Sequence, residues 1–276
     1  MEKIPYLIVS PNYYPSSAGV RMLHKLCHHL NESGYDAYMN CDVLNPEWNE
    51  KISPIGKFAY LIYEGIVIYP EIQTGNPLGA KVVVRYILNH PGLLGGDKEY
   101  DPSEILFTCN GEELRKYVPS DDRVLYIPLI EDYFRDEGLP RKGGCFYVGK
   151  GGNIPEIPET KGMKQIFNMN RMEVAHTLKT SEVFYTYDNF TMLIDEAEAC
   201  GCPVVVVGET IPKKPDLYKK NFKEQFENFI RITQEEALER FEDMRDEIAI
   251  KWMKEHPSYV DMVNGDNLKS ISERPC

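Results

Sequence analysis

The chain has 276 residues, enough for two domains of about 130 residues each and for a sizeable core. Apolar residues make up 42% of it and charged residues 27%, an ordinary composition for a globular protein. The formal net charge is −12, whereas extended contact with nucleic acid or with anionic lipid needs a basic surface. The charge therefore argues against both of these as partners.

Two further features bear on the compartment. No apolar run approaches the roughly 18 residues of a membrane span, and residues 1–10 lack the layout of a signal peptide. The seven cysteines are odd in number, and Cys200 and Cys202 are separated by one residue only, too few for the usual zinc spacing. We therefore expect reduced thiols, a cytoplasmic location and no integral membrane segment.

The first half of the chain alternates between predicted strands and helices. Residues 4–9 form an apolar strand, and a loop rich in Pro, Ser and Gly leads to an amphipathic helix that Gly34 closes. Asn76-Pro77 has the pattern of a helix start. Further strands are predicted at 35–40, 65–69, 81–88, 105–109 and 123–127, with a short helix at 112–117. This alternation predicts one Rossmann-like α/β domain over residues 1–128.

A second α/β domain is predicted at 145–244, after a linker at 129–144 that mixes charge, Pro and Gly. It opens with a strand at 145–148 and continues with a helix at 165–178. A strand at 183–187, a polar loop, a helix closed by Gly201 and a valine strand at 204–207 follow. Because the valine strand shows no polar alternation, we expect it to be covered on both faces. Helices are predicted at 224–229 and 235–254.

The loop before the helix that Gly201 closes is the predicted ligand site. Ligands of open α/β sheets bind beyond the carboxyl ends of the strands, where helix N-termini also point. The backbone N–H groups of Phe190, Thr191 and Met192 lie at such a helix start. Free N–H groups and the helix dipole favour an anion there, and a phosphate is the natural guest.

Acidic side chains flank this predicted anion site. Asp195, Glu196 and Glu198 point in different directions around the helix, so only one of them can face the cleft squarely. Asp188 and Glu196, with seven residues between them, could put one carboxylate at the loop tip and one on the helix. The plain alternative is an ordinary strand–helix–strand unit with a solvated acidic helix.

Residues 188–205 consist of an acid, seven further residues, Glu-Ala, a small-residue turn and Gly-Cys-Pro-Val-Val. This pattern resembles the donor site of GT-B glycosyltransferases, in which two Rossmann-like domains face each other across a cleft. The resemblance implies that Glu196 holds the ribose hydroxyls of a nucleotide-sugar and that Asp188 lies near the sugar. It also implies that Phe190 and Thr191 hold the pyrophosphate. Asp188 departs from the family, which usually has Glu there. A closing helix, at 245–265, would cross back to complete the first domain.

The first loop of the chain also resembles the family, in which small residues let an acceptor or a sugar approach the backbone. Here these residues would be Ser17, Ala18 and Gly19, with Ala18 where a second glycine is common. Arg21 and His24, near the start of the following helix, are further substrate-binding candidates. Their alternative interpretation is a solvated helix face.

Four more residues are candidates at strand ends. The resemblance implies that His90, after the strand at 81–88, contacts the sugar or the acceptor, although a turn histidine without a role is the alternative. It implies two cations on the leaving diphosphate, Lys150 and Lys161; a lysine in a solvated turn is the alternative. Glu71 and His90 are both considered as the general base that an inverting enzyme needs, and neither is identified.

The expected function is transfer of a sugar from a nucleoside diphosphate to a hydroxyl of a glycan or small-molecule acceptor. A UDP-sugar is the default donor and a GDP-sugar is possible, with no other cofactor. No D-x-D pair is present, so we expect no metal, and the absence of G-x-G-x-x-G and G-x-x-x-x-G-K-[ST] argues against NAD and ATP. A sugar-nucleotide epimerase, a binding-only or degenerate protein and a DNA-glucosylating enzyme are the alternatives. Retention or inversion and the oligomeric state do not follow from the sequence.

Overall fold

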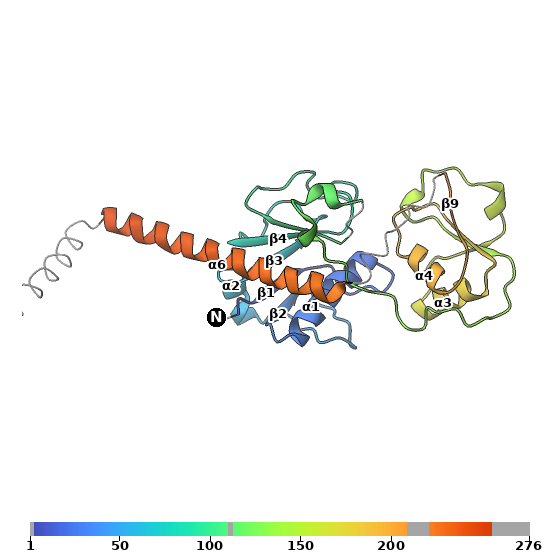
Figure 1. Cartoon of the computed structure of the whole chain (residues 1–276), viewed down its shortest axis with the longest axis horizontal. Helices are drawn as coiled ribbons and strands as arrows, with labels where there is room; N and C mark the ends of the chain where they lie inside the picture. Colours follow the sequence, from blue (N-terminus) through green and yellow to red (C-terminus); the bar gives the residue numbers. More distant parts are fainter. Residues whose placement is uncertain (1–2, 110–112, 209–220, 256–276) are drawn as a thin grey trace, which may run out of the picture.

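The chain folds as two Rossmann-like α/β domains that lie side by side (Figure 1), in a computed structural model that describes residues 3–109, 113–208 and 221–255. Each domain is built on one parallel sheet. Loops at the carboxyl ends of both sheets line the same cavity, so the two sheets face each other across a cleft. The predicted fold class, two Rossmann-like domains in a GT-B arrangement, is confirmed.

The first sheet has five parallel strands in the order β2-β1-β3-β4-β5. Their bounds are β1 Tyr6–Val9, β2 Ala37–Asn40, β3 Ile66–Pro70, β4 Val82–Ile87 and β5 Ile105–Thr108. The order reverses between β1 and β3, which makes a switch point where ligands of such sheets bind. The strand predicted at 123–127 is wrong: within the described residues only a single bridge, from Thr108 to Val124, pairs this segment with the sheet.

Helices cover both faces of the first sheet. Helices α1 (Ala18–Glu32) and α6 (Phe222–Glu255) share one apolar cluster with one face, while α2 (Ile55–Tyr63) packs on the other face. The side chains alternate accordingly, since Tyr6 and Ile8 belong to the first cluster and Leu7 to the second. Ser17 caps α1 by accepting a hydrogen bond from the Val20 N–H at 3.4 Å.

Helix α6 belongs to the first domain from its beginning. It is one continuous helix from Phe222, not two helices, and it lies along the first domain with its far end projecting beyond it (Figure 1). Phe226, Phe229, Ile232 and Phe241 pack into the cluster of the first sheet. The assignment of residues 222–244 to the second domain, and the start of the crossing helix at 245, are therefore wrong, because these apolar side chains fill the first core.

The second sheet has four parallel strands in the order β7-β6-β8-β9. Their bounds are β6 Gly144–Tyr147, β7 Lys164–Gln165, β8 Val183–Thr186 and β9 Val204–Val206. Helices α3 (Arg171–Thr180) and α4 (Leu193–Ala199) share its apolar cluster. The chain places β7 on one side of β6 and β8 on the other. The switch point of this sheet therefore lies between β6 and β8, as that of the first sheet lies between β1 and β3.

Three local predictions in this part of the chain and before it differ from the structure. The helix predicted at 165–178 begins at Arg171, because Asn170 and Glu173 form a capping box there. No helix follows Asn76, whose Oδ1 instead accepts from the Ala80 N–H at 2.9 Å and holds a turn. Strand β9 is not covered on both faces, since Val205 is 39% exposed.

Short 3-10 helices complete the described chain, at Arg115–Tyr117, Asp121–Arg123, Gly149–Gly151 and Pro158–Thr160. The first of these replaces part of the helix predicted at 112–117, of which residue 112 lies outside the described residues. Across the three described ranges, no helix combines the length and the apolar character that a membrane span requires.

Candidate functional site

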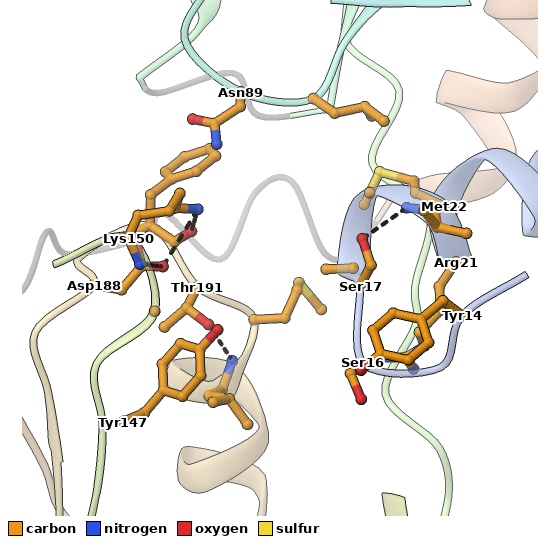
Figure 2. Close-up of a pocket in the computed structure, with 18 of the residues that line it drawn as sticks. Tyr14, Ser16, Ser17, Arg21, Met22, Asn89, Tyr147, Lys150, Asp188 and Thr191 are labelled. Atoms are coloured by element: carbon orange, nitrogen blue, oxygen red, sulfur yellow. Dashed lines mark hydrogen bonds and ion pairs between the residues drawn. The ribbon is translucent and has the colours of Figure 1, made fainter. Parts of the chain in front are cut away.

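A cavity of about 810 Å³ lies between the two domains. Its walls are the loops that follow β1, β3 and β4 in the first domain and β6, β7 and β8 in the second. The cavity therefore lies over the switch points of both sheets, where open α/β sheets bind their ligands. Its volume is in the range of sites for small molecules and cofactors. Figure 2 shows the two walls, with Ser17 and Arg21 on one side and Lys150, Asp188 and Thr191 on the other.

Glycines shape the loop after β6. Gly149 has φ +51°, and a Cβ there would lie 2.6 Å from Asp188 Oδ2. A Cβ on Gly151 would collide with the carbonyl oxygen of Tyr187. Only glycine lets this loop pack so closely on the end of β8. The packing brings Lys150, which lies between the two glycines, to the cavity wall.

Asp188 holds the two loops of the second domain together. Its Oδ1 accepts from the Phe190 N–H at 3.0 Å, and its Oδ2 accepts from the Lys150 N–H at 3.2 Å. The Lys150 ammonium lies 3.4 Å from Oδ2 and donates to the Phe190 carbonyl at 2.8 Å. Asp188 is 4% exposed. Its carboxylate is thus hydrogen-bonded within the protein, whereas the resemblance implied that it lies near the sugar.

The start of α4 is only partly the expected row of N–H donors. The Phe190 N–H points to Asp188, so its expected phosphate contact is not available in this arrangement. The Thr191 hydroxyl accepts from the N–H of Leu193, the first residue of α4, at 3.3 Å. Among the described residues, the N–H groups of Thr191 and Met192 have no protein acceptor. Of the three N–H groups predicted to bind an anion, these two are therefore not taken up by a protein acceptor among the described residues.

Glu196 lies on the cavity wall but is completely buried. Arg171, from α3, donates to it with two parallel bonds, Nη1 to Oε2 at 3.0 Å and Nη2 to Oε1 at 2.6 Å. Asp195 lines the cavity as well, so the expectation that one acid of the helix faces the cleft is too narrow, while Glu198 is exposed. A ribose bound at Glu196 would have to share this carboxylate with Arg171.

Arg21 connects the two domains through this carboxylate. It comes from α1 of the first domain, it is 2% exposed, and its Nη1 lies 3.4 Å from Glu196 Oε1. Its Nη2 donates to Glu131 Oε1 at 2.7 Å and to the carbonyl of Leu129, both in the linker. Arg171 also binds Glu131, at 2.8 Å. Two arginines and two glutamates thus join both domains and the linker.

The charges of this cluster balance each other. Burial disfavours ionisation of Glu131, but the hydrogen bond from Arg171 and the charges of Arg21 and Arg171 outweigh it and lower the pKa of Glu131. The same pairing raises the pKa of Arg171 against the effect of its burial. Glu131 and Arg171 are therefore held in their charged forms. The cluster pairs two arginines with two glutamates, so it contributes domain arrangement to the site rather than net formal charge.

Eleven of the residues predicted from sequence line the cavity, namely Ser17, Ala18, Gly19, Arg21, Glu71, Lys150, Asp188, Phe190, Thr191, Met192 and Glu196. Gly19 is not required sterically, since an added Cβ would meet Leu88 Cδ1 at an ordinary 3.6 Å. The structure thus brings together residues that lie as far as 179 positions apart, on both sides of the linker.

Three predicted residues lie outside the cavity lining. His24 is completely buried, with Nδ1 3.1 Å from Glu50 and Nε2 3.1 Å from the Pro11 carbonyl, so its expected substrate contact is wrong. Lys161 is exposed and does not reach the cavity wall. His90 stands beside the lining: its ring lies 5.8 Å from the ring of Phe190, and its Nδ1 is 3.4 Å from the Tyr117 hydroxyl.

Several residues of the site were not predicted, among them Arg171, which lines the cavity, and its partner Glu131, which lies outside the lining. Arg171 and Glu131 have no local signal for their pairing, although the Asn170-x-x-Glu173 capping box in the sequence marks where α3 begins. Residues 165–169, the end of β7 and the loop after it, line the cavity, where a helix was expected. Within this loop Asn168 has φ +52° and is the one non-glycine residue of the described chain in the left-handed region.

Groups of three or more His, Cys, Asp or Glu side chains able to hold a metal ion are not found in the described part of the chain.

Comparison with known proteins finds likenesses among solved structures. No protein-family model matches the chain, and no curated protein matches it. Among solved structures, the chain is similar to that of a "putative UDP-N-acetylglucosamine 2-epimerase" from Listeria monocytogenes, with a TM-score of 0.43 and 9% sequence identity. The match covers 86% of this chain and 90% of that chain.

Proposed function

We propose that this protein is a glycosyltransferase that takes a sugar from a nucleoside diphosphate and passes it to an acceptor hydroxyl in the interdomain cavity. The observation that carries the proposal is the position of the cavity, which lies over the switch points of two facing parallel sheets. One sheet can then hold the donor and the other the acceptor. The residues of the wall supply polar groups to both.

The second domain is the proposed donor side. Lys150 carries a positive charge at the cavity wall, and the N–H groups of Thr191 and Met192 have no protein acceptor among the described residues. Such groups stabilise the charge that develops on a leaving diphosphate. Glu196 accepts the ribose hydroxyls in this proposal, with Arg171 holding the carboxylate in place. A metal ion is not required, because Lys150 takes the charge-neutralising role.

The first domain is the proposed acceptor side. Ser17 and Gly19, at the start of α1, and Glu71, after β3, line that half of the cavity. A hydroxyl of a glycan or of a small molecule is the proposed acceptor. We propose a UDP-sugar as the default donor and a GDP-sugar as the alternative. The residues of the cavity wall do not favour either base.

A thermal-shift panel tests the proposal. UDP, GDP, ADP, TDP and CMP are compared with and without a chelator, and a diphosphate is expected to raise the melting temperature most, with no effect of the chelator. Sugar donors of the selected base are then incubated with the protein. Release of the nucleotide together with a glycosylated or hydrolysed sugar supports a transferase. Conversion of the donor into another nucleotide-sugar would indicate an epimerase, and binding without turnover a binding protein.

A further inference from the structure

Helix α6 continues past the domain that it covers. Phe241 is its last buried residue, and none of the residues 242–255, which form the projecting segment, is buried. At a rise of 1.5 Å per residue, the projecting segment extends the helix by roughly 21 Å, or about four turns. Figure 1 shows this end of α6 leaving the first domain on the side away from the second. Packing of an apolar face stabilises most helices, but beyond Met244 no residue of the segment belongs to the described apolar clusters.

The projecting segment exposes large apolar side chains. Four of them are between 43% and 69% exposed, namely Ile248, Ile250, Trp252 and Met253. Ile248 and Trp252 follow Met244 at intervals of four residues, so these three lie on one face of the helix. Phe241 shares that face and packs into the core of the first domain. The apolar stripe that fills this core therefore continues past its edge, and an exposed patch of this kind marks a contact surface.

The charges of the projecting segment differ between its two halves. Residues 242–247 carry four acids and one arginine, whereas residues 250–255 carry two lysines and one acid. Two copies that ran in the same direction would bring their acidic halves together, which is unfavourable. In opposite directions, the lysines of each copy lie beside the acids of the other. The segment is therefore complementary in charge to a second, antiparallel copy of itself.

We propose that two copies of this protein form a dimer in which their projecting segments pair in opposite directions, with Ile248 at the twofold axis. Met244 and Trp252 lie four residues before and four residues after Ile248. Met244 of each copy then contacts Trp252 of the other, and Ile248 contacts its own counterpart. Both copies use the same surface, as twofold-symmetric dimers do. This contact removes the exposed apolar stripe from water.

A second copy suits this surface better than an anionic membrane does, because acids outnumber basic residues in the segment. The pairing also leaves the interdomain cavity open, since the segment points away from the second domain (Figure 1). The dimer is therefore independent of the proposed transferase function.

The size of the contact sets the expected affinity. Two paired helices of about four turns bury less than the roughly 800 Å² per partner of a standard interface. We therefore expect a reversible dimer, with a dissociation constant in the micromolar range, rather than an obligate one.

Sedimentation equilibrium of the full chain between about 1 and 300 µM tests the proposal. The wild-type protein is compared with Ile248→Asp, which puts a charge at the centre of the contact. Ile55→Asp is the matched control, because Ile55 is 98% exposed on α2 and lies outside the projecting segment. Neither change removes a core contact, and circular dichroism checks that each variant keeps the fold.

A double variant, Lys251→Glu with Lys254→Glu, tests the direction of pairing. In the antiparallel dimer it places acids beside acids, so the dimer is weakened. In a parallel dimer it only exchanges one pair of like charges for another.

The wild-type protein and Ile55→Asp are expected to pass from monomer to dimer over this concentration range. Ile248→Asp is expected to raise the dissociation constant at least about 100-fold, and the double lysine variant at least about tenfold. A wild-type protein that stays monomeric, as it would if residues 256–276 covered the stripe, would overturn the proposal. A dimer that Ile248→Asp leaves intact would do the same. Wild-type affinity in the double variant would rule out the antiparallel direction, and the proposal with it.

Discussion

Arg171 on α3 and Glu196 on α4 form a buried two-pronged ion pair, with Nη1–Oε2 at 3.0 Å and Nη2–Oε1 at 2.6 Å. Glu196 is completely buried, and Arg21 of the other domain approaches it to 3.4 Å. The carboxylate that the sequence assigned to a ribose is therefore also the point at which the two domains meet. A ligand that bound this carboxylate would therefore also act on the arrangement of the domains.

Arg171→Met is expected to lower the free energy of unfolding by about 3 kcal/mol, because it leaves the buried Glu196 carboxylate without its main partner. Urea denaturation measures this loss. The matched control is Arg135→Met, which breaks the exposed pair of Arg135 with Glu137 and is expected to cost less than about 1 kcal/mol. Equal losses in the two variants would mean that the buried pair has no special part in stability.

Glu196→Gln is expected to weaken binding of UDP by about tenfold or more, because hydrogen bonds to a charged group are worth roughly 1.5–3 kcal/mol. Glu198→Gln serves as the control, since Glu198 lies two residues further along the same helix and is exposed. Isothermal titration calorimetry gives both dissociation constants. If both variants bind UDP like the wild type, the proposed ribose contact is wrong.

Lys150→Ala is expected to weaken UDP much more than UMP. The ammonium lies at the cavity wall beside Asp188, and in the proposed complex it neutralises the second phosphate, which UMP lacks. Lys161→Ala, which removes an exposed lysine away from the cavity, is the control and leaves both affinities unchanged. A loss of the same size for UDP and UMP in Lys150→Ala would place the charge elsewhere than on the second phosphate. The measurement is titration calorimetry with the two nucleotides.

The buried pair of His24 with Glu50 is expected to make stability depend on pH. Burial disfavours the charged imidazole, but hydrogen bonds from His24 to Cys41, Glu50 and the Pro11 carbonyl raise its pKa to about 9. A pKa that is higher in the folded than in the unfolded chain gives stability that is complete below about pH 6.5 and is lost as the pH rises towards 9. At about 1.4 kcal/mol per pKa unit, the loss is up to about 3 kcal/mol.

His24→Gln tests this, with the free energy of unfolding measured by urea denaturation between pH 6 and pH 9.5. The wild-type protein loses stability across this interval, and the variant, which has no titrating group there, loses much less. His176→Gln, at an exposed position, keeps the wild-type profile. Parallel profiles for wild type and His24→Gln would show that this histidine does not carry the pH dependence.

The sequence predicted the strands well where the side chains alone determine them. Largely apolar runs such as those at 65–69 and 81–88 favour a buried parallel strand, and they became β3 and β4. The segment at 123–127 also looks like a strand but makes a single bridge, because strand formation needs a partner as well as propensity. The local sequence pattern thus predicts that a segment can form a strand more reliably than it predicts which strand pairs with it.

The candidate site was predictable only in part, and for the same reason. Loops at strand ends could be located, so Lys150, Asp188 and Glu196 were found and do line one cavity. The partner of Glu196 could not be found, because the pairing with Arg21 spans 175 residues and the pairing with Arg171 spans 25. Side-chain contacts between residues so far apart in the sequence depend on how the helices and domains pack. No periodic pattern in the sequence reports that packing.

Hydrogen exchange measured with and without UDP tests most directly whether the interdomain cavity binds a nucleoside diphosphate. The account predicts slower exchange of backbone amides at 148–152, in the loop after β6, and at 188–196, in the loop after β8 and the start of α4, with the rest of that domain unchanged. Unchanged exchange in both loops under conditions where UDP is bound, or protection confined to the far side of either sheet, would contradict it.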